Sequence, residues 1–142
     1  EWIARGGAAV TRRYHLSAAH CLPTDHIPER DNQQFYGRCQ PSKLHGHNYI
    51  LAVTVGGRID PDTGMVTDLT ALDRLVREAV LARFDSRSFN DDPAFATIAP
   101  TGENLAKLTW DLLVKQIPGG RLERIEVTET PESSYKYIGA QP

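Results

Sequence analysis

Two histidines spaced two positions apart, with a cysteine six residues before the first, form the segment best suited to chemistry. They are His45 and His47, separated by Gly46, and the cysteine is Cys39. In a strand, alternate side chains project from the same face, so both imidazoles would point in one direction. Imidazole is a common zinc ligand, and a thiol beside a metal loses its proton more readily. The segment therefore predicts a metalloenzyme site.

Three protein ligands with one open position are typical of catalytic rather than structural zinc sites. His20, at the end of a predicted strand, is the best choice for the third ligand, whereas His15 and His26 are better explained as structural or exposed side chains. The predicted metal site is Zn²⁺ held by His20, His45 and His47. An isolated His-x-His pair also occurs as two ordinary strand histidines, so the motif alone leaves both interpretations open.

The composition indicates one globular domain that spans residues 1–142. The chain is 40% hydrophobic and 24% charged, and its net charge of −2 gives no sign of a nucleic-acid-binding surface. It has no apolar run long enough to cross a membrane, so no membrane partner is expected. Its two cysteines, Cys21 and Cys39, do not suggest a disulfide framework. A reducing compartment, the cytoplasm, is the expected location.

Hydrophobic periodicity predicts strands toward both ends of the chain and helices in the middle. A first helix is expected to begin near Asp68 or Thr70, and a second is expected to begin near Thr101 and to end before Pro118. The predicted strands are 8–19, 48–58, 122–130 and 134–138. The order ββααββ predicts an α+β fold, with two helices on one face of a four-stranded antiparallel sheet.

A carboxylate is expected on the inner face of the third predicted strand. Glu129 shares strand parity with Ile125 and Val127, so the three side chains should point toward the interior. A buried carboxylate needs hydrogen-bond partners. An inward-facing Glu129 would therefore require such partners.

Five segments, taken together, resemble the family of 6-pyruvoyl-tetrahydropterin synthase and 6-carboxy-tetrahydropterin synthase. They are Ser17-Ala-Ala-His20, Cys39 ahead of His45-Gly-His47-Asn-Tyr49, Asp60-Pro-Asp-Thr-Gly-Met65-Val66, Thr101-Gly-Glu-Asn104 and Val127-Thr-Glu-Thr130. The resemblance implies the tunnelling fold (T-fold). In that fold the sheets of three subunits join into a barrel, and two trimers stack as a homohexamer with active sites between subunits.

The resemblance also implies roles for individual residues. The three histidines would hold zinc, and Cys39 would be the thiolate that moves protons on the substrate side chain. Glu129 would bind the pterin ring, with an additional contact from Thr101. Asp85 matches a family aspartate that orients a histidine in a proton relay.

The chain departs from the family pattern at that relay, because Ser86 stands where the histidine is expected. A serine hydroxyl has no pKa near neutrality and cannot replace a general acid or base by itself. Three explanations stay open. His26 or a group from a neighbouring subunit could substitute, the reaction could need only zinc and Cys39, or the chain could be a non-catalytic or mutated relative. The retention of Cys39, the three histidines and Glu129 favours a working but altered enzyme.

The leading functional prediction is a zinc-dependent lyase that acts on 7,8-dihydroneopterin triphosphate. It would eliminate triphosphate and give 6-pyruvoyl-tetrahydropterin. The five residues between Cys39 and His45 resemble this branch, since the spacing in the carboxy-forming branch is usually shorter. The alternatives are 6-carboxy-tetrahydropterin synthase of the queuosine pathway and a non-catalytic pterin-binding protein.

Overall fold

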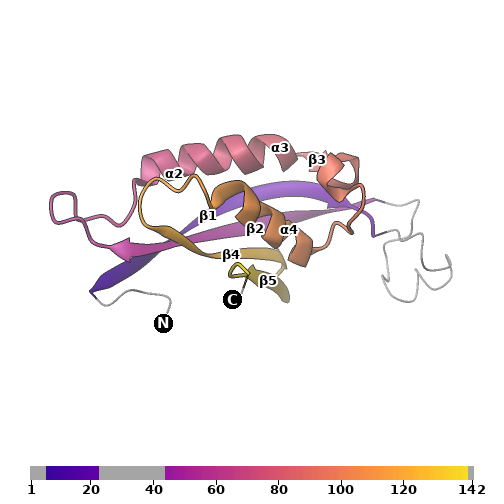
Figure 1. Cartoon of the computed structure of the whole chain (residues 1–142). Coiled ribbons are helices and arrows are strands. Elements are labelled where there is room, and N and C mark those ends of the chain that lie inside the picture. The colour runs from indigo at the N-terminus through magenta and orange to yellow at the C-terminus, as the bar shows by residue number, and fades with distance from the viewer. Residues whose placement is uncertain (1–5, 23–43, 141–142) are drawn as a thin grey trace.

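The computed structural model describes residues 6–22 and 44–140. One sheet runs through it in the order β3-β1-β2-β4-β5 (Figure 1). The strands are β1 (Gly7–His20), β2 (His45–Arg58), β3 (Arg87–Ser88), β4 (Arg121–Thr130) and β5 (Ser133–Tyr137). The four longer strands pair antiparallel, whereas β3 pairs parallel to β1 at Ala18 and Ala19.

The prediction of a four-stranded antiparallel sheet is right for the four longer strands and wrong in omitting β3. A strand of two residues is too short to show an alternating pattern, so periodicity could not reveal it. The predicted α+β class is confirmed.

Two helices cover the same face of the sheet (Figure 1). The first runs continuously through α2 (Leu69–Val76), a π-helical segment η1 (Arg77–Leu81) and α3 (Ala82–Phe84), and the second is α4 (Gly102–Leu113). Two short 3₁₀ turns, η2 (Phe89–Asp91) and η3 (Pro93–Phe95), lie between them. Side chains cap both helices: Asp68 Oδ1 accepts from Ala71 N at 3.0 Å, and Thr101 Oγ1 accepts from Asn104 N at 3.2 Å. Of the two residues at which the first helix was expected to begin, Asp68 rather than Thr70 is the cap.

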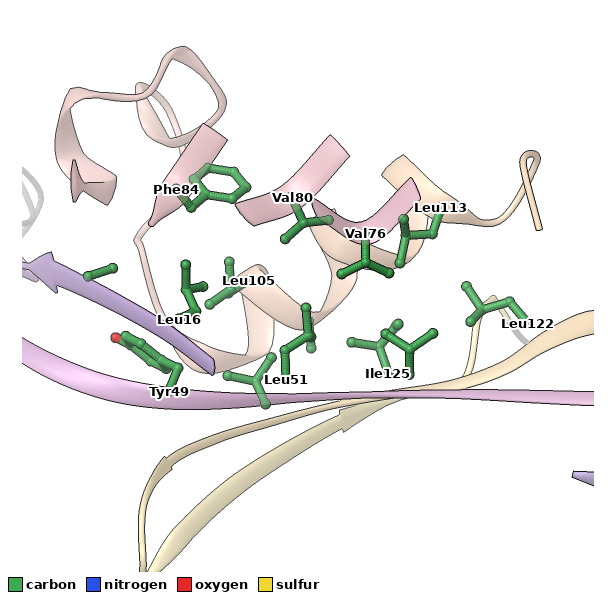
Figure 2. Close-up of a cluster of buried hydrophobic side chains, with 14 of the residues drawn as sticks. Leu16, Tyr49, Leu51, Val76, Val80, Phe84, Leu105, Leu113, Leu122 and Ile125 are labelled. Atoms are coloured by element: carbon green, nitrogen blue, oxygen red, sulfur yellow. The ribbon is translucent and has the colours of Figure 1, made fainter. Parts of the chain in front are cut away.

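The core lies between the helices and the inner face of the sheet (Figure 2). Alternate residues of β2 are no more than 2% exposed: Tyr49, Leu51, Val53 and Val55. They meet apolar side chains of both helices, including Val76, Val80, Phe84, Leu105 and Leu113. Burial of this stripe determines which face of β2 points inward.

Two irregularities in the pairing of β4 adjust which of its side chains face the core. The β2–β4 register shifts between Thr54 and Val55, which lets both Leu122 and Ile125 point inward. The β4–β5 register shifts between Thr128 and Thr130. The second shift lies at Glu129, and bulges of this kind often re-aim a side chain beside a functional site.

Within the described residues, no helix is both long enough and apolar enough to cross a membrane.

Candidate functional site

Strand pairing brings three histidines together at one end of the sheet. His20, the last residue of β1, pairs with His45, the first residue of β2, and Ala18 pairs with His47. His45 and His47 share strand parity with the buried Tyr49, so both imidazoles lie on the helix-covered side. One ligand atom from each of the three histidines lies within 4.8 Å of the others. The structure therefore places the three predicted ligands in a single cluster.

A backbone carbonyl fixes the orientation of the most buried histidine. His20 is 2% exposed, and its Nδ1 lies 2.8 Å from the carbonyl oxygen of Pro100. Because a carbonyl oxygen only accepts, Nδ1 carries the hydrogen and donates it. In the neutral ring, Nε2 then carries the lone pair, and it lies 3.1 Å from Nε2 of His45. This arrangement is typical of metal-binding histidines, whose second nitrogen is held by a protein acceptor.

One pair of ring nitrogens lies at about the separation expected for two ligands of a tetrahedral ion. His20 Nε2 and His45 Nε2 are 3.1 Å apart. Zinc–nitrogen bonds of about 2.0–2.1 Å at tetrahedral angles separate two ligand atoms by about 3.3 Å. The three rings are mutually steep, with interplanar angles of 68°, 84° and 87°. The rings therefore meet edge to face and are not stacked on one another.

Burial keeps all three imidazoles neutral. It is the main cause that lowers the pKa of His20, His45 and His47, and the neighbouring histidines lower it further. The carboxylate of Glu129 opposes this shift in each case. A neutral imidazole is the form that binds a metal. The cluster is therefore ready to accept a cation at neutral pH.

Glu129 lies beside the histidines, as its strand parity predicts. Its side chain is 16% exposed, and Oε1 lies 3.6 Å from His20 Nε2 and 3.9 Å from His47 Nε2. The imidazoles are neutral, so these contacts are not ion pairs. The carboxylate borders the cluster and remains accessible, as binding a ligand next to a metal would require.

Two tyrosines border the same carboxylate. Tyr49 is buried, and burial together with Glu129 raises its pKa. Tyr135, on the outermost strand β5, donates from its hydroxyl to Glu129 Oε2 at 3.5 Å. Burial and Glu129 likewise raise the pKa of Tyr135, so both hydroxyls stay protonated. Neither tyrosine was predicted to belong to the site from sequence. The signal available for Tyr135 was its position on the predicted strand 134–138.

The start of α4 closes one side of the site. Pro100 holds His20, Thr101 caps the helix, and Gly102 lies under the ring of Tyr135. The predicted contact of Thr101 with a ligand stays a prediction, since its hydroxyl oxygen accepts the hydrogen bond of the cap. Thr101 nevertheless directly follows Pro100, whose carbonyl oxygen orients His20, one of the three proposed zinc ligands.

Asp85 and Ser86 follow α3 directly and hold the end of β1. Asp85 Oδ1 accepts from Ser17 N at 2.9 Å, and Ser86 N donates to Ser17 O at 2.6 Å. Ser86 has φ 61°, a left-handed conformation in which histidine is more frequent than most residues. Ser86 and His47 both line a pocket of about 460 Å³. The contacts give Asp85 a structural role at the helix end, and its catalytic role stays a prediction.

Cys39 and His26 lie outside the described residues, so their predicted places are untested. Cys21 is 2% exposed, and its backbone exchanges two hydrogen bonds with the side chain of Asn90. It fits the interpretation of a structural cysteine. His15 is exposed on β1, as expected for a histidine outside the metal site.

A second pocket, of about 830 Å³, lies at the opposite end of β2. It is lined by residues 58–63, 65–68, 118 and 119. Among the described residues, the one group of three potential metal ligands is the histidine cluster. The three histidines therefore favour their end of the sheet as the functional site, although the pocket at the other end is larger.

Comparison with known proteins agrees with this geometry. A model of the family described as 6-pyruvoyl tetrahydropterin synthase matches residues 9–140. The chain belongs to this family. The 6-pyruvoyl tetrahydropterin synthase family match covers all three clustered histidines and Glu129, and it confirms the resemblance drawn from the sequence.

Two relatives align over more than nine-tenths of the chain, and a third aligns over 72% of it. The chain is 39% identical over 133 residues to 6-pyruvoyl tetrahydrobiopterin synthase of Homo sapiens, covering 93% of this chain and 92% of that protein. The structure of Caenorhabditis elegans 6-pyruvoyl tetrahydropterin synthase superposes with a TM-score of 0.88 at 31% identity, covering 94% and 96% of the two chains. The 6-carboxy-5,6,7,8-tetrahydropterin synthase of Bacillus subtilis is 31% identical over 106 residues, covering 72% of this chain and 62% of that protein.

Replacing one of the clustered histidines should abolish tight zinc binding. We expect wild-type protein to bind one zinc per chain and His45→Ala to retain less than about a tenth of it, because two ligands cannot complete the site. Metal analysis after dialysis against a weak chelator measures this. His15→Ala, which removes an exposed histidine from the same sheet, is the matched control and should bind normally. Equal zinc content in His45→Ala and wild type would contradict the site.

Proposed function

We propose that this protein is a zinc-dependent lyase that converts 7,8-dihydroneopterin triphosphate to 6-pyruvoyl-tetrahydropterin. The observation that carries the proposal is the convergence of three neutral histidines beside one accessible carboxylate, Glu129. The histidines provide a place for a cation, and the carboxylate provides an acceptor for the pterin ring. Family membership makes this combination more specific than either feature alone.

The residues fit zinc as the resident ion. His20 donates from Nδ1 to Pro100, which leaves Nε2 as the metal-binding nitrogen, and burial lowers its pKa. The 3.1 Å between His20 Nε2 and His45 Nε2 suits two ligands of a tetrahedral ion. When bound, zinc supplies a Lewis acid that makes the side-chain hydroxyls and their adjacent C–H bonds more acidic. Three protein ligands leave coordination room for oxygen atoms of the substrate.

The chain's own residues orient the substrate and move its protons. Glu129 accepts two parallel hydrogen bonds from the amino group and the ring N–H of the pterin. The thiolate of Cys39 removes and returns protons on the substrate side chain. The reaction balances internally. One side-chain hydroxyl carbon is oxidised to a carbonyl as the C=N bond of the dihydropterin ring is reduced. The other becomes a carbonyl as the neighbouring carbon loses triphosphate and, through the enol, becomes the methyl group. No external oxidant is needed.

The pyruvoyl-forming reaction is favoured over the carboxy-forming one. The human relative named for the pyruvoyl product is 39% identical and aligns over 93% of the chain, against 31% and 72% for the Bacillus subtilis relative named for the carboxy product. The five-residue spacing between Cys39 and His45 points the same way. Side-chain cleavage to 6-carboxy-tetrahydropterin is the second candidate.

We also propose that the working unit is a hexamer of two stacked trimers. Apart from the two-residue β3, no described strand pairs with the outer edge of β1, and none pairs with the outer edge of β5. Long unpaired edges are avoided in stable monomers, so joining β1 of one subunit to β5 of the next would satisfy both. Light scattering should give a mass six times that of the 15.8 kDa chain; a monomeric mass would contradict the assembly.

Incubation with 7,8-dihydroneopterin triphosphate tests the reaction. We expect the zinc-loaded protein to release triphosphate and form a pyruvoyl-pterin, identified by mass spectrometry. Cys39→Ala should lower turnover by at least about 100-fold, the usual contribution of a positioned acid or base, while zinc content stays unchanged. A carboxy-pterin with acetaldehyde would favour the second candidate. Binding without turnover would refute the lyase.

Restoring the family histidine at position 86 should raise turnover. The left-handed backbone at Ser86 accepts histidine, and the adjoining pocket of about 460 Å³ has room for the ring. Ser86→His would add a group that titrates near neutrality, so kcat should rise about 10-fold or more with little change in KM. Ser86→Asn, which also tolerates this backbone but does not titrate, is the control. An unchanged kcat in Ser86→His would mean that another group already serves the relay.

A further inference from the structure

The ring of Tyr135 packs against the backbone of Gly102, at the first residue of α4. A Cβ atom added at Gly102 would lie 2.1 Å from Cδ2 and 2.4 Å from Cε2 of that ring. Contacts this short with a ring carbon cannot be accommodated without moving the ring. The absence of a side chain at position 102 is therefore what allows Tyr135 to lie where it does.

This placement directs the hydroxyl of Tyr135 to the carboxylate that is proposed to bind the pterin. The hydroxyl donates to Glu129 Oε2 at 3.5 Å, while Oε1 faces His20 and His47. Each carboxylate oxygen thus has a polar neighbour on one side. The hydroxyl contact is longer than a strong O–H···O bond, and a carboxylate has about four lone-pair sites. Glu129 is therefore held in direction but keeps the capacity to accept bonds from a ligand.

Glu129 needs such support because of where it lies. It lies at the register shift between β4 and β5, where the regular pairing of residues across the two strands is interrupted. The turn to β5 follows immediately, so Tyr135 returns to the site only six residues later. A side chain on β5 is well placed to limit the rotamers of Glu129.

We propose that Tyr135, seated on Gly102, is a positioning residue that orients the Glu129 carboxylate toward the N–H edge of the pterin. The inference rests on the proposed function and adds a specificity-determining pair to it. Orientation of a carboxylate decides whether it can accept two parallel hydrogen bonds or only one. Loss of the hydroxyl should therefore weaken pterin binding without removing the metal site.

The first test compares Tyr135→Phe with wild type, using 7,8-dihydroneopterin as the probe and zinc-loaded full-length chain. We expect the Kd from fluorescence titration to rise about 3- to 10-fold, the usual range for one hydrogen bond. KM for the triphosphate substrate should rise by a similar factor with a smaller change in kcat, and zinc content should be unchanged. Tyr137→Phe is the matched control, since that ring packs on Trp110 instead. An unchanged Kd in Tyr135→Phe would overturn the inference.

A double-mutant cycle separates positioning from direct contact. If Tyr135 acts through Glu129, Tyr135→Phe should have no further effect on Kd in a Glu129→Ala background, where the acceptor of its hydroxyl is gone. Independent, multiplying effects of the two substitutions would overturn the positioning role.

The glycine contact gives an independent test. Gly102→Ala should weaken probe binding about as much as Tyr135→Phe, because the new methyl group displaces the ring. In a Tyr135→Ala background the space is open, so Gly102→Ala should have little additional effect. Equal effects of Gly102→Ala in both backgrounds would overturn the proposed pair. Failure of the wild-type protein to bind the probe would overturn the proposed function itself, and the inference with it.

Discussion

The register between β1 and β2 is the constraint on which the site depends. It sets His20 directly opposite His45, with His47 two residues further along the same face. Side chains alternate along a strand, so a slip of one residue would send both β2 histidines to the other face. The same register buries Tyr49, Leu51, Val53 and Val55. Packing of the core therefore also assembles the histidine cluster.

Desolvation and a nearby carboxylate act in opposite directions on the cluster. Burial lowers the pKa of each of the three histidines, while Glu129 raises it. The net result is three neutral imidazoles next to the negatively charged carboxylate of Glu129, with no cation among these four side chains. Such a site favours a cation and a ligand with N–H donors. Pro100 and Tyr135, from the start of α4 and from β5, orient the two ends of this arrangement.

Much of this arrangement could be predicted from local patterns. The alternation in β2, the caps at Asp68 and Thr101 and the inward direction of Glu129 follow from strand and helix periodicity. The two-residue strand β3 leaves no periodic signal. The contact of Tyr135 with Gly102 joins residues 33 positions apart and depends on how β5 packs against α4. Local sequence could predict neither β3 nor the contact between Tyr135 and Gly102, because both depend on the tertiary arrangement.

The proposed mechanism depends on a zinc site made of three histidines without the cysteine. X-ray absorption at the zinc edge of the metal-loaded chain measures this directly. We expect nitrogen or oxygen scatterers at about 2.0–2.1 Å, with the outer-shell pattern of about three imidazoles. Sulfur at about 2.3 Å, or fewer than three imidazoles, would contradict it. A sulfur ligand would also remove Cys39 from its proposed role as the proton carrier.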